Sequence, residues 1–194
     1  MEKLKLPEAV TVSRTSSRNS VMVRQPTIGR NLPEITNPQT DIELQRLWSA
    51  WVPVSGARTI RRSLTDNERA ALVARRDALL PFVSGYLDEE RDQIAVSIGG
   101  MFGGYRSMRQ DDRAAAAIIA GTLNLVREFP AWAIVKACDS IRRNGIWKPA
   151  TMKYDRTWPP NDAEIIAAVR DELRLIEPQY RRVASMLTAE VESK

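Results

Sequence analysis

Two proline boundaries, each beside an aromatic residue, divide the middle of the chain into helical segments. Phe129-Pro130 and Trp158-Pro159-Pro160 both interrupt apolar residues that recur at helical spacing. Proline disfavours helical backbone in the residue before it, but it suits the first turn of a following helix. We therefore predict that one helix ends and another begins at each boundary. At the second boundary, Asn161 and Glu164 supply an N-cap and its capping-box partner.

Apolar side chains recur at helical spacing through most of the chain after residue 64. Glu68, three residues after Thr65, completes a capping-box sequence, and Pro81 is expected to end or kink the helix that follows. The predicted helices begin near Thr65, Asp88, Asp111, Pro130, Asp162 and Pro178. The sequence thus predicts an all-α fold, a compact bundle of five to six helices over residues 65–194. The helix over 111–128 is expected to be central, and the last helix either packs on the domain or projects from it.

Four glycines within residues 99–108, GGMFGGYRSM, invite comparison with loops that bind phosphate. The stretch lacks the GK[ST] ending of a P-loop, and it follows a predicted helix rather than a strand. We interpret it as a helix end and a turn, where the backbone packs closely against a neighbouring helix.

The first 40 residues are rich in Ser, Thr, Pro, Asn and Arg and show no sustained apolar pattern. They predict a disordered basic tail over 1–40, either a solvated linker or a segment that folds on a partner or contacts DNA phosphates. Residues 41–64 predict a short helix, DIELQRLWSAW, stopped by Pro53 and followed by a linker, GARTIRRS. Trp48 and Trp51 on that helix either dock on the helical domain or anchor another protein.

The residue inventory argues against an enzyme. The chain has no histidine and one cysteine, Cys138, which falls on the inward side of a predicted helix, so thiolate-imidazole dyads and nearly all zinc sites are excluded. A magnesium site of carboxylates stays open in principle, but each candidate also suits a helix start; these candidates are Asp88, Glu90, Asp111 and Asp112. We predict no catalytic residue, no metal and no cofactor.

Charge and hydropathy give weaker indications. The formal charge of +5 favours anionic partners mildly. The sequence contains no apolar run of the roughly 18 residues that a membrane helix needs, and no signal peptide. We expect a cytoplasmic protein with no membrane partner.

Residues 146–160, IWKPATMKYDRTWPP, predict a long loop in which rings alternate with cations. The rings are Trp147, Tyr154 and Trp158, and the cations are Lys148, Lys153 and Arg156. This composition is typical of surfaces that stack on single-stranded bases and neutralise their phosphates. The alternative is that the rings close the end of the helical bundle. In the preceding linker, Arg58, Arg61 and Arg62 are either phosphate contacts or a solvated hinge.

The order of these features resembles a known family. A helix start at FPAW, an Asn-Gly helix end, a loop and the junction Trp158-Pro159-Pro160-Asn161-Asp162-Ala163-Glu164-Ile165 resemble the phage helicase loader-and-inhibitor family of replication accessory proteins. The resemblance covers about residues 65–176, and the longer GIWKPATMKYDRT insertion and the N-terminal tail depart from it. It implies a protein that does no chemistry, binds the hexameric replicative helicase and helps deliver it to DNA.

Two sets of candidate binding residues follow. Those for a helicase or another large protein partner are Trp48, Trp51, Trp132, Trp158 and Glu164. Those for nucleic acid, with single-stranded DNA as the expected form, are Arg58, Arg61, Arg62, Lys148, Lys153 and Arg156. Two other classes stay open: a DNA-binding regulator or packaging subunit, and a small inhibitor that occludes a host enzyme.

Overall fold

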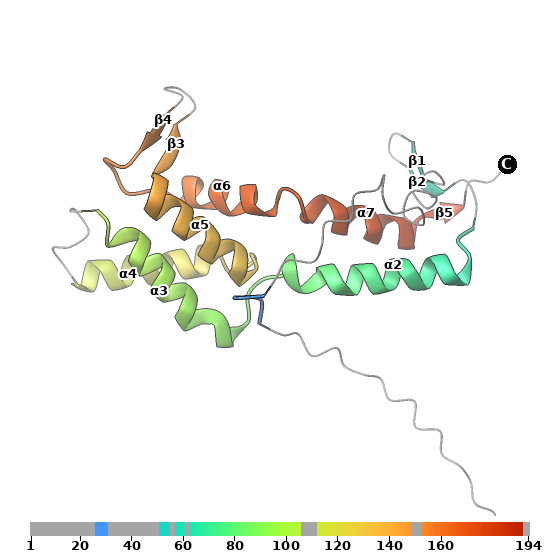
Figure 1. The fold of residues 1–194 in the computed structure, drawn as a ribbon, viewed down its shortest axis with the longest axis horizontal. Helices are drawn as coiled ribbons and strands as arrows, with labels where there is room; N and C mark the ends of the chain where they lie inside the picture. The colour runs from blue at the N-terminus through green and yellow to red at the C-terminus, as the bar shows by residue number, and fades with distance from the viewer. Residues whose placement is uncertain are drawn as a thin grey trace, which may run out of the picture.

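The computed structural model describes residues 26–30, 51–54, 57–60, 63–105, 112–148 and 153–191, of which the strands at 51–54, 57–60 and 190–191 are described by their backbone alone. This part of the chain is mostly helical, so the all-α prediction is confirmed (Figure 1). Its six α-helices are α2 (Asp66–Leu79), α3 (Arg91–Phe102), α4 (Asp112–Leu125), α5 (Ala131–Asn144), α6 (Asp162–Leu173) and α7 (Glu177–Thr188).

Local sequence signals place the helix starts as predicted. The backbone N–H of Glu68 donates to Thr65 Oγ1 at 3.3 Å, and the N–H of Thr65 donates to Glu68 Oε2 at 2.9 Å. This reciprocal capping box begins α2. Asn161 and Glu164 form the same box at α6, with both hydrogen bonds at 3.0 Å. Pro130 has extended backbone and precedes α5 directly.

Short 3₁₀ turns follow or precede two of the helices. The α2 helix ends at Leu79, where Pro81 is accommodated in the turn Leu80–Phe82. The acidic stretch Asp88–Glu90 forms a second turn that leads into α3. At the other end of α3, a Cβ added at Gly99 would lie 3.4 Å from Ile119 of α4, an ordinary contact, and one added at Gly100 would meet no atom within 4 Å. The predicted close packing against a neighbouring helix therefore does not require these two glycines.

The central helix is α5, and the prediction that the helix over 111–128 is central was wrong. The α5 helix packs between α3 and α6, whereas α4 packs mainly against α3 (Figure 1). Seven of the fourteen α5 residues are buried, against Thr122 and Leu123 alone in α4. Ile118 of α4 is 37% exposed. The alanine-rich first half of α4 has the periodicity of a packed helix, but it offers little apolar area to bury.

The described helices pack around two apolar clusters. The larger contains side chains of α3, α4, α5 and α6 together with Leu79 at the end of α2. The smaller joins Leu72 of α2 to Val183 and Met186 of α7. The α7 helix therefore packs on the domain rather than projecting from it, and α6 and α7 follow one another along one side of the molecule (Figure 1).

A small sheet lies beside α7 where the sequence predicted a helix end and a linker. Strand β1 (Trp51–Val54) pairs antiparallel with β2 (Ala57–Ile60), and β2 pairs parallel with β5 (Glu190–Val191). The linker prediction was wrong at 57–60, and Trp51 begins a strand. The signal was present, because β-branched residues flank Ser55-Gly56 as in a hairpin. Residues 41–50, including Trp48 of the predicted helix, lie outside the described part.

The predicted disordered tail contains an ordered segment, Pro26–Arg30. Thr27 is 4% exposed, and its backbone N–H and Oγ1 both donate to Glu90 Oε1, the second at 3.1 Å. The N–H of Ile28 donates to the same oxygen at 3.3 Å, and the Ile28 side chain packs against the larger cluster. The prediction of disorder was therefore wrong for 26–30, because a buried carboxylate accepts this segment's backbone donors. The rest of the predicted tail lies outside the described residues.

Candidate functional site

The stretch predicted to be a loop over 146–160 contains a two-stranded hairpin. Strand β3 (Ile146–Lys148) pairs antiparallel with β4 (Lys153–Asp155), so that Trp147 lies opposite Tyr154 and Lys148 opposite Lys153. Gly145 ends α5 with φ of +84°, and a Cβ there would overlap the carbonyl oxygen of Asp155. Glycine is thus needed both for the backbone conformation and for the close approach of β4.

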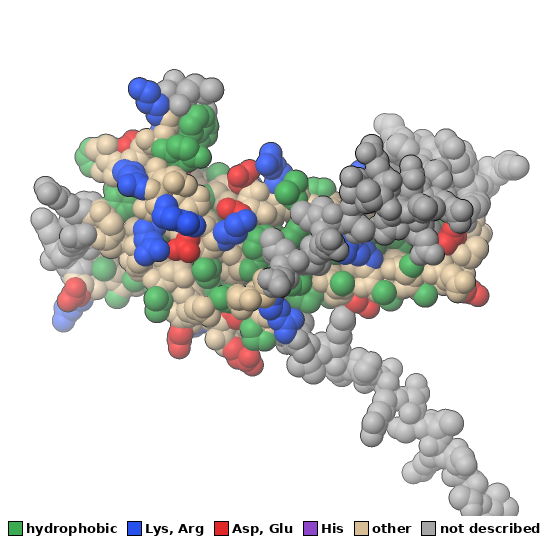
Figure 2. All heavy atoms as spheres, in the orientation of Figure 1, with side chains coloured by type: hydrophobic (Ala, Val, Ile, Leu, Met, Phe, Trp, Pro, Cys, Tyr) green, Lys and Arg blue, Asp and Glu red, His purple; other side chains and the backbone are tan. Residues whose placement is uncertain are grey.

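Three aromatic side chains are exposed on and after this hairpin. Trp147 is 45%, Tyr154 59% and Trp158 71% exposed. The rings of Trp147 and Tyr154 meet edge to face, with centroids 5.1 Å apart and an interplanar angle of 63°. Figure 2 shows hydrophobic side chains gathered on the hairpin at the upper left. The interpretation in which these rings close the end of the bundle does not hold for Tyr154 and Trp158, which are mostly exposed, whereas Trp147 is about half-buried beside α5 and α6.

A groove of about 720 Å³ lies between α5, α6 and the hairpin. Its lining includes small side chains from both helices, among them Ala137 and Ser140 of α5 and Ala163 and Ala167 of α6. The exposed rings of Trp147 and Tyr154 form the hairpin side. The groove was not predicted from the sequence, although the alanines four residues apart on α6 were a readable sign of a small-residue stripe.

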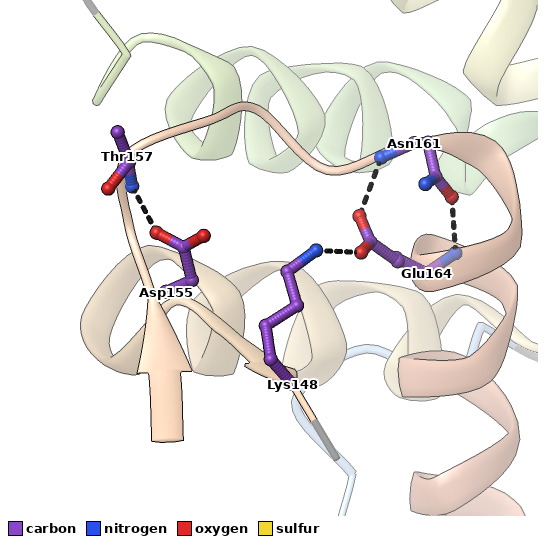
Figure 3. A network of polar contacts seen from close by, with 5 residues as sticks. All are labelled: Lys148, Asp155, Thr157, Asn161 and Glu164. Carbon is purple, nitrogen blue, oxygen red and sulfur yellow. Dashed lines mark hydrogen bonds and ion pairs between the residues drawn. The ribbon is translucent and has the colours of Figure 1, made fainter. Parts of the chain in front are cut away.

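One ion pair crosses the groove lining, between Lys148 of β3 and Glu164 of α6 (Figure 3). Lys148 Nζ donates to Glu164 Oε1, while Glu164 Oε2 accepts the N–H of Asn161 at 3.0 Å. The hydrogen bond to Glu164 raises the pKa of Lys148. Burial by itself raises the pKa of Glu164, but the hydrogen bonds from Lys148 and Asn161 outweigh it and leave the pKa below its ordinary value.

This pairing changes the roles predicted for both residues. Lys148 was predicted to contact nucleic acid and Glu164 to contact a protein partner, yet each is the other's counter-ion. Glu164 also caps α6, so it holds the hairpin against the start of that helix. The pair joins the hairpin to the start of α6 and so positions the groove wall, while the contacts of Lys148 to nucleic acid and of Glu164 to a protein partner stay predictions.

Polar groups at the base of the hairpin complete the site. The N–H of Thr157 donates to Asp155 Oδ1 at 2.7 Å, and this hydrogen bond lowers the pKa of Asp155 (Figure 3). Burial raises the pKa of Tyr105, while the charge of Arg156 acts in the opposite direction. The turn after α3 thus lies within electrostatic reach of the hairpin. Sequence reasoning missed Tyr105, because only the folded chain brings it close.

Trp132 does not belong to a partner-binding surface, and that prediction was wrong. It is the second residue of α5 and is 7% exposed. Its indole Nε1 donates to the carbonyl oxygen of Phe82 at 3.0 Å. A tryptophan so buried contributes to the core, and its one polar atom already has an acceptor.

The remaining predicted residues do not form one site. Trp158, Lys153 and Arg156 lie together at the hairpin and its exit and are exposed. Trp51 and Arg58 lie in β1 and β2, at the opposite end of the molecule (Figure 1). Trp48, Arg61 and Arg62 lie outside the described residues. Among the described residues, the structure therefore brings together the candidates between Lys148 and Glu164 and leaves Trp51, Arg58 and Trp132 apart from them.

The described residues hold no group of three or more side chains suited to bind a metal ion. Of the carboxylates considered for a magnesium site, Asp111 lies outside the described residues. The Glu90 carboxylate already accepts hydrogen bonds from the 26–30 segment. Burial raises the pKa of Cys138 to about 12, so its thiol stays protonated near neutral pH. Among the helices described, none combines the length and apolar character needed to span a bilayer.

Comparison with protein families, with curated proteins and with solved structures found no match to this chain. The site is therefore interpreted from its own geometry: an open groove with small side chains, flanked by exposed rings and held by an ion pair. Such a surface is suited to bind a ligand, because small side chains leave space between the two helices and exposed rings border it.

Proposed function

We propose that this chain is a non-enzymatic, phage-type DNA replication accessory protein of the cytoplasm, which binds the replicative helicase and controls its loading on DNA. The observation that carries the proposal is the groove between α5 and α6 with exposed rings along one side. The choice of helicase as partner rests on the resemblance of the junction from Trp158 to Ile165 to the helicase loader-and-inhibitor family.

The groove is suited to a helix of a partner protein. Small side chains at Ala163 and Ala167 let a second backbone approach closely, and the two helices that bound the groove provide ridges for it to pack against. Aromatic side chains at the rim are the residue type that most often anchors protein interfaces. Lys148 and Glu164 neutralise one another at the groove wall, so an apolar helix face meets little unpaired charge there.

Filling the groove tests this function. Ala167→Arg introduces a long side chain at an exposed, mid-helix position and keeps helix propensity high. We expect it to weaken binding to the hexameric helicase of the host at least about 10-fold by calorimetry, in the range of losses at interface centres. Ala117→Arg on the exposed face of α4 is the matched control and is expected to bind as the wild type. Wild-type affinity in Ala167→Arg, or no helicase binding by the wild type, would refute the proposal.

A second readout separates the two modes of control. A loader increases helicase-dependent unwinding of a forked substrate coated with single-strand-binding protein, whereas an inhibitor lowers ATP hydrolysis or unwinding by the same hexamer. Either effect, absent in Ala167→Arg, supports the proposed function. An effect of equal size in Ala167→Arg would show that the groove is not its source.

A further inference from the structure

We propose that the hairpin and the residues that follow it, here called the hairpin face, bind single-stranded nucleic acid through base stacking on Tyr154 and Trp158 and phosphate contacts to Lys153 and Arg156. This binding surface is distinct from the small-residue floor of the groove, and it does not depend on the helicase being the partner.

Large apolar side chains are exposed at scattered positions and in one cluster. Six of them are exposed in the described residues: Val96, Ile118, Trp147, Tyr154, Trp158 and Leu175. The three that are aliphatic are scattered over α3, α4 and the turn after α6. The three that are aromatic all belong to the hairpin and its exit. Scattered single aliphatic residues are ordinary on a protein surface, but a cluster of exposed rings marks a binding surface.

The geometry of the rings suits bases. An edge-to-face contact between Trp147 and Tyr154 leaves at least one face of each ring uncovered by the other. Trp158, the most exposed of the three, precedes Pro159 and lies outside α6. Unpaired bases stack on such rings whatever their sequence, whereas the stacked pairs of a duplex have no free faces to offer.

The charge around the rings complements a phosphate backbone. Residues 142–158 hold five Lys and Arg side chains against one Asp, a net charge of +4, whereas the whole chain carries +5. Figure 2 shows Lys and Arg side chains beside and below the hydrophobic side chains of the hairpin. Rings with adjacent cations are the combination that binds single strands.

Some of these cations already pair with groups of the protein, which leaves fewer candidates for contacting phosphates. Lys148 pairs with Glu164, and Arg142 pairs with Asp139 at 3.2 Å. Arg143 donates to the carbonyl oxygen of Asp139 at 3.3 Å, near the end of α5, where a cation also favours the helix dipole. Lys153 and Arg156 are exposed on either side of Tyr154 and Asp155. These two exposed cations lie one and two residues from Tyr154 in sequence, and we take them as the ones that contact phosphates next to a stacked base.

The test measures binding of a fluorescein-labelled 20-nucleotide oligothymidylate by anisotropy, with the full chain and without helicase. Because the assay contains no helicase, its failure bears on the hairpin face alone and leaves the proposed function untouched. We expect binding at low salt that weakens steeply as salt is raised. Unlabelled duplex of the same length should compete at least about 10-fold less well. An oligouridylate and an oligodeoxyuridylate are measured in parallel, because these two differ in the sugar alone, and tighter binding of either one identifies the preferred sugar and supports the proposal.

Two double variants separate the contributions. Tyr154→Ala with Trp158→Ala is expected to lower affinity by about 5- to 150-fold for each ring that stacks on a base. Lys153→Gln with Arg156→Gln is expected to reduce the slope of log affinity against log salt by about 1.4, the value for two phosphate contacts to a single strand. Both variants should fold, since all four side chains are exposed, and circular dichroism checks this.

Matched controls are Leu175→Ala, an exposed apolar residue away from the hairpin, and Arg170→Gln, an exposed cation of α6. Both should bind as the wild type. The proposal is overturned if the wild type does not bind at about 50 mM salt, if duplex competes as well as the single strand, or if the ring variant keeps its affinity. It is also overturned if the controls lose as much affinity as the hairpin variants.

Discussion

Trp132 and Trp158 lie at the two proline boundaries of this chain, and the fold treats them in opposite ways. Trp132 follows Pro130, lies in the first turn of α5, and is buried with its indole N–H bonded to Phe82. Trp158 precedes Pro159, lies before α6 begins, and is exposed to solvent. The same pair of residue types thus produces a core residue in one place and a surface ring in the other.

The difference lies in the position of the helix that follows each boundary. The α5 helix packs between α3 and α6, so a side chain in its first turn enters the core on whichever side it points. The α6 helix packs against α5 on one face, and the chain reaches it from an exposed hairpin. At both boundaries a helix begins after the proline, but the burial of the nearby tryptophan depends on packing between helices that no local pattern records.

Removing each tryptophan ring in turn tests this difference in burial most directly. Trp132→Ala leaves a cavity and an unbonded carbonyl at Phe82, so we expect it to lower the free energy of unfolding by about 3–5 kcal/mol. Trp158→Ala should change it by less than about 0.5 kcal/mol, as for other surface substitutions. Urea denaturation monitored by far-UV circular dichroism measures both. Equal losses would show that the two rings do not differ in the way described.

The buried Trp132 is linked through hydrogen bonds to the 26–30 segment and, through that segment, to Glu90. Its backbone N–H donates to Thr27 Oγ1 at 3.4 Å, and Thr27 in turn donates to Glu90. Glu90→Ala removes the acceptor of three donors from the 26–30 segment and should destabilise the fold by about 2–3 kcal/mol. Glu90→Gln keeps one acceptor and should cost less. Glu89→Ala, at the exposed neighbour, is the control, and a similar loss there would contradict the role given to Glu90.

The reactivity of the Cys138 thiol measures the burial of α5 in the unaltered chain. Burial raises the pKa of its thiol to about 12 from 9.0, so the neutral form is favoured in the folded protein. The stability that follows from this shift is complete below pH 9 and is lost as the pH rises toward 12. At about pH 8, below both of these values, we expect a thiol reagent to label the folded chain far more slowly than the chain in guanidinium chloride. Equal rates would place the thiol in solvent.

The smallest expected effect is on the pH dependence of stability, through two carboxylates near the exposed Trp158. The pKa of Glu164 and that of Asp155 are lowered in the folded chain, so the stability they add is complete above their ordinary values of 4.5 and 3.8. It is lost as the pH falls through the lower folded values. Glu164→Gln should reduce the dependence of stability on pH below about 5, measured by urea unfolding from about pH 7 to about pH 3. The control substitution Glu89→Gln, at an exposed position, should leave the dependence unchanged.

The parts of the fold that follow from the sequence are those determined by neighbouring residues. Capping by Thr65 and by Asn161 and the start of α5 at Pro130 each depend on contacts within four residues, and all three were predicted. The hairpin was missed although its cations and rings were identified, because a strand of three residues is too short to show an alternating pattern.

Contacts between distant residues could not be predicted in this way. Thr27 and Glu90 are 63 residues apart in sequence, and nothing near either one indicates the other. The same is true of β2 and β5, whose parallel pairing joins Thr59 to Glu190. For the candidate site, Lys153, Arg156 and Trp158 were identified because they are adjacent in the chain. The groove was not, because α5 and α6 form it only after packing.

The contact between Thr27 and Glu90 also governs how this polypeptide can be shortened. A form that begins at residue 26 retains every donor to the carboxylate, whereas one that begins at residue 31 leaves Glu90 enclosed with the N–H of Leu87 as its remaining backbone donor among those described. Loss of activity in the second form would then report a weakened core as readily as a missing interaction arm. Removing residues 1–25 and removing residues 1–30 are consequently different experiments. The first tests whether the arm is needed to bind a partner, and the second also tests whether the domain stays folded.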